Sequence, residues 1–128
     1  MKAVILCAGL GSRTGFDYPK RLYKFDDGST LLSKNIESIK KYGFKNSDII
    51  LVTGYKSSLI KKETNNLYEY VQNRNYAITN MVYSFNEVIK KHKSQNYYIF
   101  YADIIYDSKN IGFLKKSKNH IVTLVDSD

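Results

Sequence analysis

A short loop after the first apolar run of the chain contains residues suited to binding phosphate. It carries small residues, two cations and a proline, namely Ala8, Gly9, Gly11, Arg13, Pro19 and Lys20. Backbone N–H groups of small residues approach an anion closely, because no large side chain blocks them. The Arg13 guanidinium offers a planar fork to phosphate oxygens, whereas Lys20 offers a mobile point charge that Pro19 restrains. The segment therefore predicts a phosphate-binding loop.

Two common phosphate-binding motifs do not match this loop. A Walker loop requires glycine, lysine and then serine or threonine, and no Gly-Lys pair occurs in the chain. A dinucleotide fingerprint would require glycine at positions 9, 11 and 14, but position 14 is Thr14. The loop is therefore neither of these two types.

The pattern of apolar residues predicts the elements that position this loop. The expected strands are residues 3–7, 49–53, 67–72, 97–101 and 121–125. The expected helices are residues 31–42, 57–63, 81–93 and 110–116. Strands that alternate with helices predict an α/β fold. We expect three Rossmann-like layers, with a mainly parallel sheet and helices on both faces.

Local signals predict how the helices begin and which side chains they bury. Thr30, Ser57 and Asn80 are the expected N-caps, because their side-chain oxygens accept hydrogen bonds from free backbone N–H groups. The residues expected to face the core are Leu32, Ile36 and Ile39 in the first helix and Val82, Phe85, Val88 and Ile89 in the third.

Three segments of the predicted fold converge at one edge of the sheet. Ligands of parallel α/β sheets bind beyond the carboxyl ends of the strands. The loop after Cys7, the Gly54-Tyr55 pair and Asp103 all follow predicted strands directly. We therefore expect a ligand site where these three segments meet.

Composition narrows the class of protein and the kinds of partner. The 128 residues predict one domain, and the single cysteine excludes an internal disulfide, which favours a cytoplasmic location. No apolar run approaches the ~20 residues of a membrane span, so no membrane partner is expected. The net charge of +8 includes several lysine pairs, which lie mostly near predicted helix ends, where cations complement the helix dipole and face water. The charge therefore predicts no specific nucleic-acid partner.

Three ordered motifs resemble those of a known family. Residues 6–20 read Leu-x-Ala-Gly-x-Gly-x-Arg-x-Gly-x-x-x-Pro-Lys, which resembles the pyrophosphorylase motif of the sugar-phosphate nucleotidyltransferases. Residues 73–84 are similar to the Asn-x-x-Tyr-x-x-Thr-Asn-Asn-x-x-Ser segment of the phosphocholine and phosphoglutamine cytidylyltransferase-like branch, with Met81 in place of the last asparagine. Residues 98–103 resemble the family strand that ends in Gly-Asp, with Ala102 in place of glycine.

The resemblance implies roles for residues of this chain. Arg13 and Lys20 would be catalytic, holding the β/γ-phosphates and stabilising charge near the α-phosphate respectively. Asp103 would bind Mg²⁺, a cation that prefers hard oxygen ligands together with substrate phosphates. The residues implied to bind the nucleotide are Leu6, Ala8, Gly9, Gly11, Ser12, Arg13, Lys20, Tyr55, Thr79, Asn80 and Ser84.

The resemblance also implies a reaction and a fold. A phosphate or phosphonate oxygen of a small-molecule acceptor would attack the α-phosphorus of an NTP, and pyrophosphate would leave. The branch resemblance favours CTP, with UTP and dTTP as alternatives. Phosphocholine, a phosphonate and the phosphoglutamine of capsule modification are the acceptors that the relatives suggest. The implied fold is nucleotide-diphospho-sugar transferase-like and C-terminally incomplete. Residues 1–128 would form the nucleotide-binding domain without most of the acceptor half, so we expect nucleotide binding and poor or no turnover alone. We also expect an open edge that favours a homodimer.

Two other classes of function remain open at this point. A nucleic-acid-binding module would use the +8 charge and the twelve tyrosines as a basic stacking surface. A non-catalytic nucleotide-binding module would bind CTP without metal-dependent chemistry. Binding of NTPs, measured with and without Mg²⁺, separates these classes.

Overall fold

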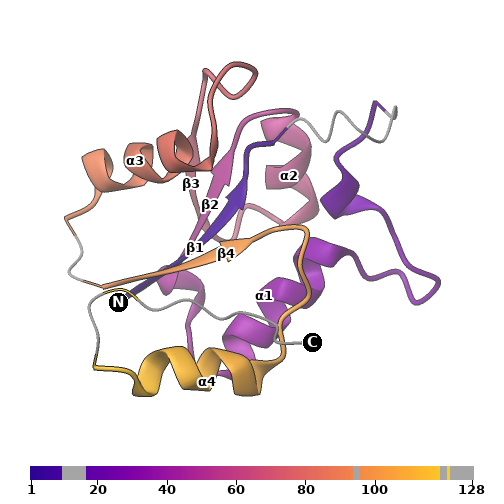
Figure 1. The fold of residues 1–128 in the computed structure, drawn as a ribbon. Helices are drawn as coiled ribbons and strands as arrows, with labels where there is room; N and C mark the ends of the chain where they lie inside the picture. Colours follow the sequence, from indigo (N-terminus) through magenta and orange to yellow (C-terminus); the bar gives the residue numbers. More distant parts are fainter. Residues whose placement is uncertain (10–16, 94–95, 119–120, 122–128) are drawn as a thin grey trace, which may run out of the picture.

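The structure is a computed structural model that describes residues 1–9, 17–93, 96–118 and 121. Within these residues a four-stranded parallel sheet has the order β3-β2-β1-β4 (Figure 1). Its strands are β1 (Lys2–Cys7), β2 (Ile49–Thr53), β3 (Glu69–Gln72) and β4 (Tyr97–Tyr101). The helices are η2 (Lys20–Leu22), α1 (Leu31–Lys41), η3 (Asn46–Asp48), α2 (Ser57–Glu63), α3 (Met81–Lys91) and α4 (Ser108–Lys116). The predicted α/β fold with a parallel sheet is confirmed.

Strand β1 lies between β2 and β4 and is buried on both faces. It pairs in parallel with both neighbours, so that Ile5 lies opposite Leu51 on one side and Phe100 on the other. This position requires apolar side chains in consecutive positions rather than an alternating pattern. The continuous run of residues 3–7 meets that requirement, and all five residues are less than a tenth exposed.

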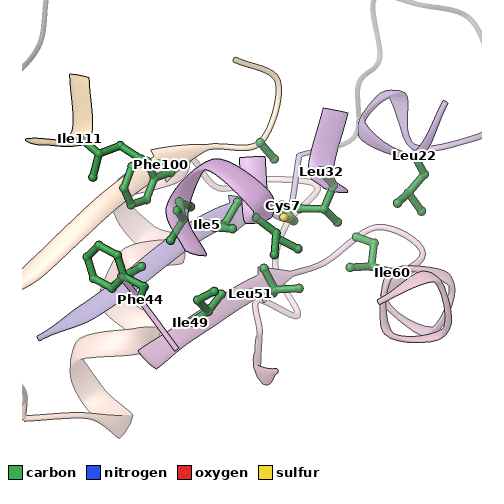
Figure 2. Packing of buried hydrophobic residues seen from close by; sticks show 14 residues of the cluster. Ile5, Cys7, Leu22, Leu32, Phe44, Ile49, Leu51, Ile60, Phe100 and Ile111 are labelled. Atoms are coloured by element: carbon green, nitrogen blue, oxygen red, sulfur yellow. The ribbon is translucent and has the colours of Figure 1, made fainter. Parts of the chain in front are cut away.

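Two hydrophobic clusters lie on opposite faces of the sheet. Ile5 and Cys7 of β1 point to the face covered by α1, α2 and α4, which contribute Leu32, Ile60 and Ile111 (Figure 2). The alternate β1 residues point to the other face, where α3 packs. The sheet thus separates two helical layers (Figure 1), as the pattern predicted.

Two of the three predicted helix caps are confirmed. The Thr30 side chain accepts from the Ser33 backbone N–H in a capping box, and the Asn80 side chain accepts from the Tyr83 backbone N–H. Ser57 is not a cap: the N-cap of α2 is Lys56, in a left-handed conformation with φ of 50°. The Ser57 hydroxyl instead lies 2.8 Å from the Thr53 hydroxyl at the end of β2, so it contacts the preceding strand.

The buried face of α3 differs from the predicted one. Val88 is fully buried as expected, but Val82 is 76% exposed and Ile89 is 45% exposed. Ser84 takes an inward position with 3% of its surface exposed. The helix is therefore rotated relative to its apolar stripe, because Ser84 hydrogen-bonds to a buried asparagine below it.

The remaining boundaries shift slightly or lie outside the description. Strand β3 begins at Glu69 rather than at residue 67, and α4 begins at Ser108 rather than at residue 110. The expected strand at 121–125 lies outside the described residues, apart from Ile121. No helix in the described part of the chain is long and apolar enough to cross a membrane.

Burial of Cys7 gives a first testable prediction. Burial raises the pKa of its thiol from 9.0 to about 12, although the nearby Arg21 charge acts in the opposite direction. The thiolate is the nucleophile, so at pH 8 we expect a thiol reagent to react at least about a hundredfold more slowly with the folded chain than with the urea-unfolded chain. The raised pKa also means that stability falls as pH rises above 9, where only the unfolded chain loses the proton. Equal reaction rates in the two states would contradict the buried position.

Candidate nucleotide site

The carboxyl end of β1 forms the floor of a cavity. Leu6 and Ala8 point to the α3 face of the sheet, and Gly9 follows them where the chain leaves the strand. The guanidinium of Arg21 donates hydrogen bonds to the carbonyl oxygens of Cys7 and Gly9, the latter at 3.0 Å. The backbone at the start of the predicted phosphate loop is thereby held in one position.

Lys20 is placed by its neighbours. It begins the short helix η2, which Pro19 precedes with φ of −61° and in which the Leu22 N–H donates to the Pro19 carbonyl at 2.8 Å. Arg21 and Leu22 are buried, whereas Lys20 is exposed and lines the cavity. Neither a hydrogen bond nor an ion pair of the Lys20 ammonium is recorded with any described residue. The ammonium is thus available to a ligand.

A buried asparagine organises the opposite wall. The Asn73 backbone N–H donates to the Thr53 carbonyl at 2.8 Å, which attaches the start of this wall to the end of β2. Its side-chain amide donates to the hydroxyls of Thr79 and Ser84, each at 2.9 Å. The Thr79 hydroxyl in turn donates to the Asn75 carbonyl at 2.8 Å. Thr79 therefore has its donor and an acceptor position occupied within the wall.

Unlike Thr79, Asn80 and Ser84 each keep a side-chain hydrogen-bond donor without a partner among the described residues. The Asn80 Oδ1 is occupied as the cap of α3, accepting from Tyr83. Its Nδ2 has no recorded partner within the described ranges, and the Ser84 hydroxyl accepts from Asn73 but keeps its own proton to donate. Both groups line the cavity, so this wall can present hydrogen-bond donors to a ligand.

Asp103 lies in the turn that follows β4. The side-chain amide of Asn35, which is fully buried on α1, lies 3.4 Å from the carbonyl oxygens of Tyr101 and Ala102. The Tyr101 N–H donates to the Tyr106 hydroxyl at 2.9 Å. These bonds fix the turn, and the exposed Asp103 lines the same cavity as Gly9 and Lys20.

The cavity lies where the strand order reverses. Strands β2 and β4 pair with opposite sides of β1, and the crevice beyond the carboxyl ends of β1 and β4 is where such sheets bind ligands. The volume is about 290 Å³. The predicted residues that line it are Leu6, Ala8, Gly9, Lys20, Thr79, Asn80, Ser84 and Asp103. The predicted Gly11, Ser12 and Arg13 lie outside the described residues.

Of the predicted site residues that the structure describes, Tyr55 is the one that does not line this cavity. Its hydroxyl donates to the Asp17 carboxylate, and this hydrogen bond, aided by Lys56, lowers the pKa of Asp17. The Tyr55 ring instead lies 6.2 Å from the ring of Tyr76, which does line the cavity. Tyr55 is thus one contact removed from the space where we expected it.

Sequence reasoning missed several lining residues, notably Arg21, Tyr76 and Met81. Tyr76 and Met81 lie within the 73–84 motif, so their positions in the motif were a usable signal. For Arg21 the only signal in the sequence was its position next to Lys20. Its role depends on a contact with carbonyls 12 and 14 residues earlier.

A larger cavity of about 470 Å³ lies elsewhere, between α1 and the segment that joins α2 to β3. It is lined by residues such as Leu32, Ile36 and Tyr68, and by none of the described residues that the motifs singled out. Volume alone would therefore have pointed to a different place than strand topology and chemistry do. We assign the candidate site to the smaller cavity, because two cations, a carboxylate and the chain segment at Ala8 and Gly9 converge there.

A parallel α/β sheet with a cavity lined by Lys20, Arg21 and Asp103 at the point where its strand order reverses has the arrangement in which open α/β sheets bind ligands. Comparison with known families identifies the class more closely. The chain belongs to the MobA-like NTP transferase domain family, whose model matches residues 3–121. The chain is thus a member of a nucleotidyltransferase family.

Individual relatives agree with this assignment. The chain is 30% identical over 128 residues to the bifunctional protein GlmU of Buchnera aphidicola subsp. Baizongia pistaciae, covering 98% of this chain and 28% of that protein. It is 32% identical over 105 residues to the bifunctional protein GlmU of Thermosipho melanesiensis, covering 81% of this chain and 22% of that protein. A solved nucleotidyl transferase from Methanothermobacter thermautotroptrophicus shares the fold, with a TM-score of 0.68 and 18% identity over 84% of this chain and 53% of that one. The chain thus spans about a quarter of the length of the two GlmU proteins and about half of the solved one.

Proposed function

We propose that this chain binds an NTP in the 290 Å³ cavity and takes part in transfer of the nucleotidyl group to a phosphorylated small molecule, with release of pyrophosphate. The observation that supports this most is the convergence of Lys20, Asp103 and the backbone at Gly9 in one cavity. Membership of an NTP transferase family agrees with it. In our proposal residues 1–128 form the nucleotide-binding domain.

The chemistry of such a transfer suits these residues. An acceptor oxygen attacks the α-phosphorus and pyrophosphate leaves, so the protein supplies alignment and charge neutralisation rather than a nucleophile. Lys20 would stabilise negative charge on the phosphates, and the backbone N–H groups near Gly9 would position them. Asn80 and Ser84 would donate hydrogen bonds to the base or the ribose.

Asp103 fits a Mg²⁺ site that is completed by the nucleotide. Mg²⁺ usually binds through one or two carboxylates together with waters and substrate phosphates. The described residues include no cluster of three or more histidine, cysteine or acidic side chains that could hold a metal ion by themselves. The Asp103 carboxylate would therefore hold Mg²⁺ together with the phosphates of the nucleotide. Mg²⁺ would supply positive charge to the triphosphate there.

CTP is the nucleotide that we propose, with CMP transferred to a phosphorylated or phosphonate acceptor in cell-surface or capsule polysaccharide modification. The support is the similarity of residues 73–84 to the cytidylyltransferase-like branch. Calorimetric titration with CTP, UTP, ATP and GTP, each with and without Mg²⁺, tests this. We expect CTP to bind most tightly, and binding of no NTP at all would contradict the proposal. A pyrophosphate-release assay with phosphocholine as acceptor separates an enzyme from a module that only binds nucleotide.

Replacing Asp103 with asparagine tests the metal site. We expect Mg²⁺ to tighten CTP binding to the wild-type chain at least about tenfold and to have little effect on Asp103→Asn, because the neutral amide is a poor ligand for a hard cation. Calorimetry at several Mg²⁺ concentrations provides the measurement. Asp26→Asn is the matched control, since Asp26 is exposed and does not line the cavity. An unchanged Mg²⁺ effect in Asp103→Asn would exclude this carboxylate as the ligand.

A further inference from the structure

Arg21 combines deep burial with a position at the proposed phosphate site. Only 8% of its surface is exposed, and it lines the same cavity as Lys20 and Asp103. Its two terminal nitrogens donate to the carbonyl oxygens of Cys7 and Gly9. The guanidinium thus lies directly beneath the backbone that leads into the predicted phosphate loop.

The charge of this guanidinium is not neutralised by the protein that surrounds it. Within the described ranges no carboxylate forms an ion pair with Arg21, although Asp103 lines the same cavity. Its Nε is buried and has no hydrogen-bond partner among the described residues. Burying a charge is costly unless it is paired and fully hydrogen-bonded. Two carbonyl dipoles offset part of that cost and leave the positive charge itself in place.

We propose that Arg21 is an anion-binding residue of the nucleotide site, whose buried charge is neutralised by the phosphates of the bound nucleotide or of pyrophosphate. The inference rests on the function proposed above and adds a residue that the motifs did not assign. Arg21 and Lys20 are consecutive and both line the cavity, so one short helix places two cations at its wall. Lys20 is the exposed, mobile charge, and Arg21 is the fixed one.

A purely structural role for Arg21 makes different predictions. If Arg21 only held the Cys7 and Gly9 carbonyls, its loss would distort the floor and weaken every ligand of the cavity equally. If it also contributes charge, its loss weakens ligands that carry phosphates and spares an uncharged nucleoside. Binding of an anion to a single fixed charge is also screened by salt, whereas nucleoside binding is not.

The test compares inorganic pyrophosphate, CTP and cytidine as ligands of the same chain by calorimetry, with Arg21→Gln and Arg21→Lys as variants. Arg74→Gln is the matched control, because Arg74 is exposed and does not line the cavity. We expect Arg21→Gln to weaken pyrophosphate and CTP at least about tenfold and to leave cytidine within about twofold. Arg21→Lys keeps the charge and should recover part of the lost affinity. The dependence of pyrophosphate affinity on salt should be shallower for Arg21→Gln than for wild type.

Each outcome of this experiment decides one question. If Arg21→Gln loses affinity equally for all three ligands, or loses none for pyrophosphate, the inference is wrong. Binding of CTP to the wild-type chain would still support the proposed function in that case. If the wild-type chain binds neither CTP nor pyrophosphate, the proposed function itself is wrong. If Arg21→Gln does not fold, Arg21→Lys and the wild-type chain still decide. Pyrophosphate must then raise the melting temperature of the wild-type chain in the absence of nucleoside, and more than it raises that of Arg21→Lys.

Discussion

Replacing Lys20 with alanine is expected to weaken CTP binding about 10–100-fold. The physical reason is that the Lys20 ammonium lines the cavity and has no recorded partner in the described part of the chain. Its charge is therefore free to act on phosphate oxygens. Because the side chain is exposed, the melting temperature should stay within about 2 °C of wild type.

Lys62→Ala is the matched control for this prediction. Lys62 is also exposed, lies in α2 and does not line the cavity. Lys62→Ala removes the same charge from the chain as Lys20→Ala, so a general effect of net charge on CTP affinity would appear equally in both variants. Equal affinity of Lys20→Ala and Lys62→Ala for CTP would show that the ammonium of Lys20 does not contact the triphosphate. A loss confined to Lys20→Ala supports the site.

The fold was largely predictable because it rests on short-range patterns. The apolar runs of β1, β2 and β4 and the caps at Thr30 and Asn80 depend on residues close in sequence. The buried face of α3 was not predictable in this way. An apolar stripe with Val82 and Ile89 inward competed with one that places Ser84 inward, and the hydrogen bond to Asn73 favours the second. Hydropathy cannot show that a buried serine will find such a partner.

The candidate site was predictable where its residues belong to a motif, and not predictable where its residues contact distant parts of the chain. The motif at 73–84 marked the wall that carries Asn80, and the motif at 98–103 marked Asp103. Neither motif shows that Asn35, on a separate helix, lies against the carbonyls of the turn before Asp103. Arg21 is a similar case, because nothing in the sequence shows that the arginine next to Lys20 is buried. Contacts with backbone carbonyls carry no residue-type signal at the accepting position.

Gly54→Ala is expected to produce the largest loss of stability among the single substitutions considered. A Cβ at this position would lie 2.6 Å from the Tyr76 Cβ and 2.8 Å from the Ala8 carbonyl oxygen. Both neighbouring atoms are fixed to the backbone, so relief requires the 73–80 wall or the end of β1 to move. We expect a loss of about 1–3 kcal/mol in the free energy of unfolding, measured by urea titration. CTP affinity should fall as well, because Tyr76 and Ala8 both line the cavity.

Gly9→Ala separates packing from ligand contact. Among the described residues, the nearest atom to a Cβ at Gly9 is the Arg21 Nη2 at 3.6 Å, an ordinary van der Waals distance, so the fold should tolerate the methyl group. In the nucleotide complex the same methyl group would lie where phosphate approaches the backbone. Gly9→Ala should therefore keep its free energy of unfolding within about 0.5 kcal/mol of wild type and still lose CTP affinity. If Gly54→Ala and Gly9→Ala both lost stability and CTP affinity in proportion, the cavity would be sensitive to any disturbance of the fold. If Gly9→Ala loses affinity alone, the backbone at the end of β1 contacts the ligand.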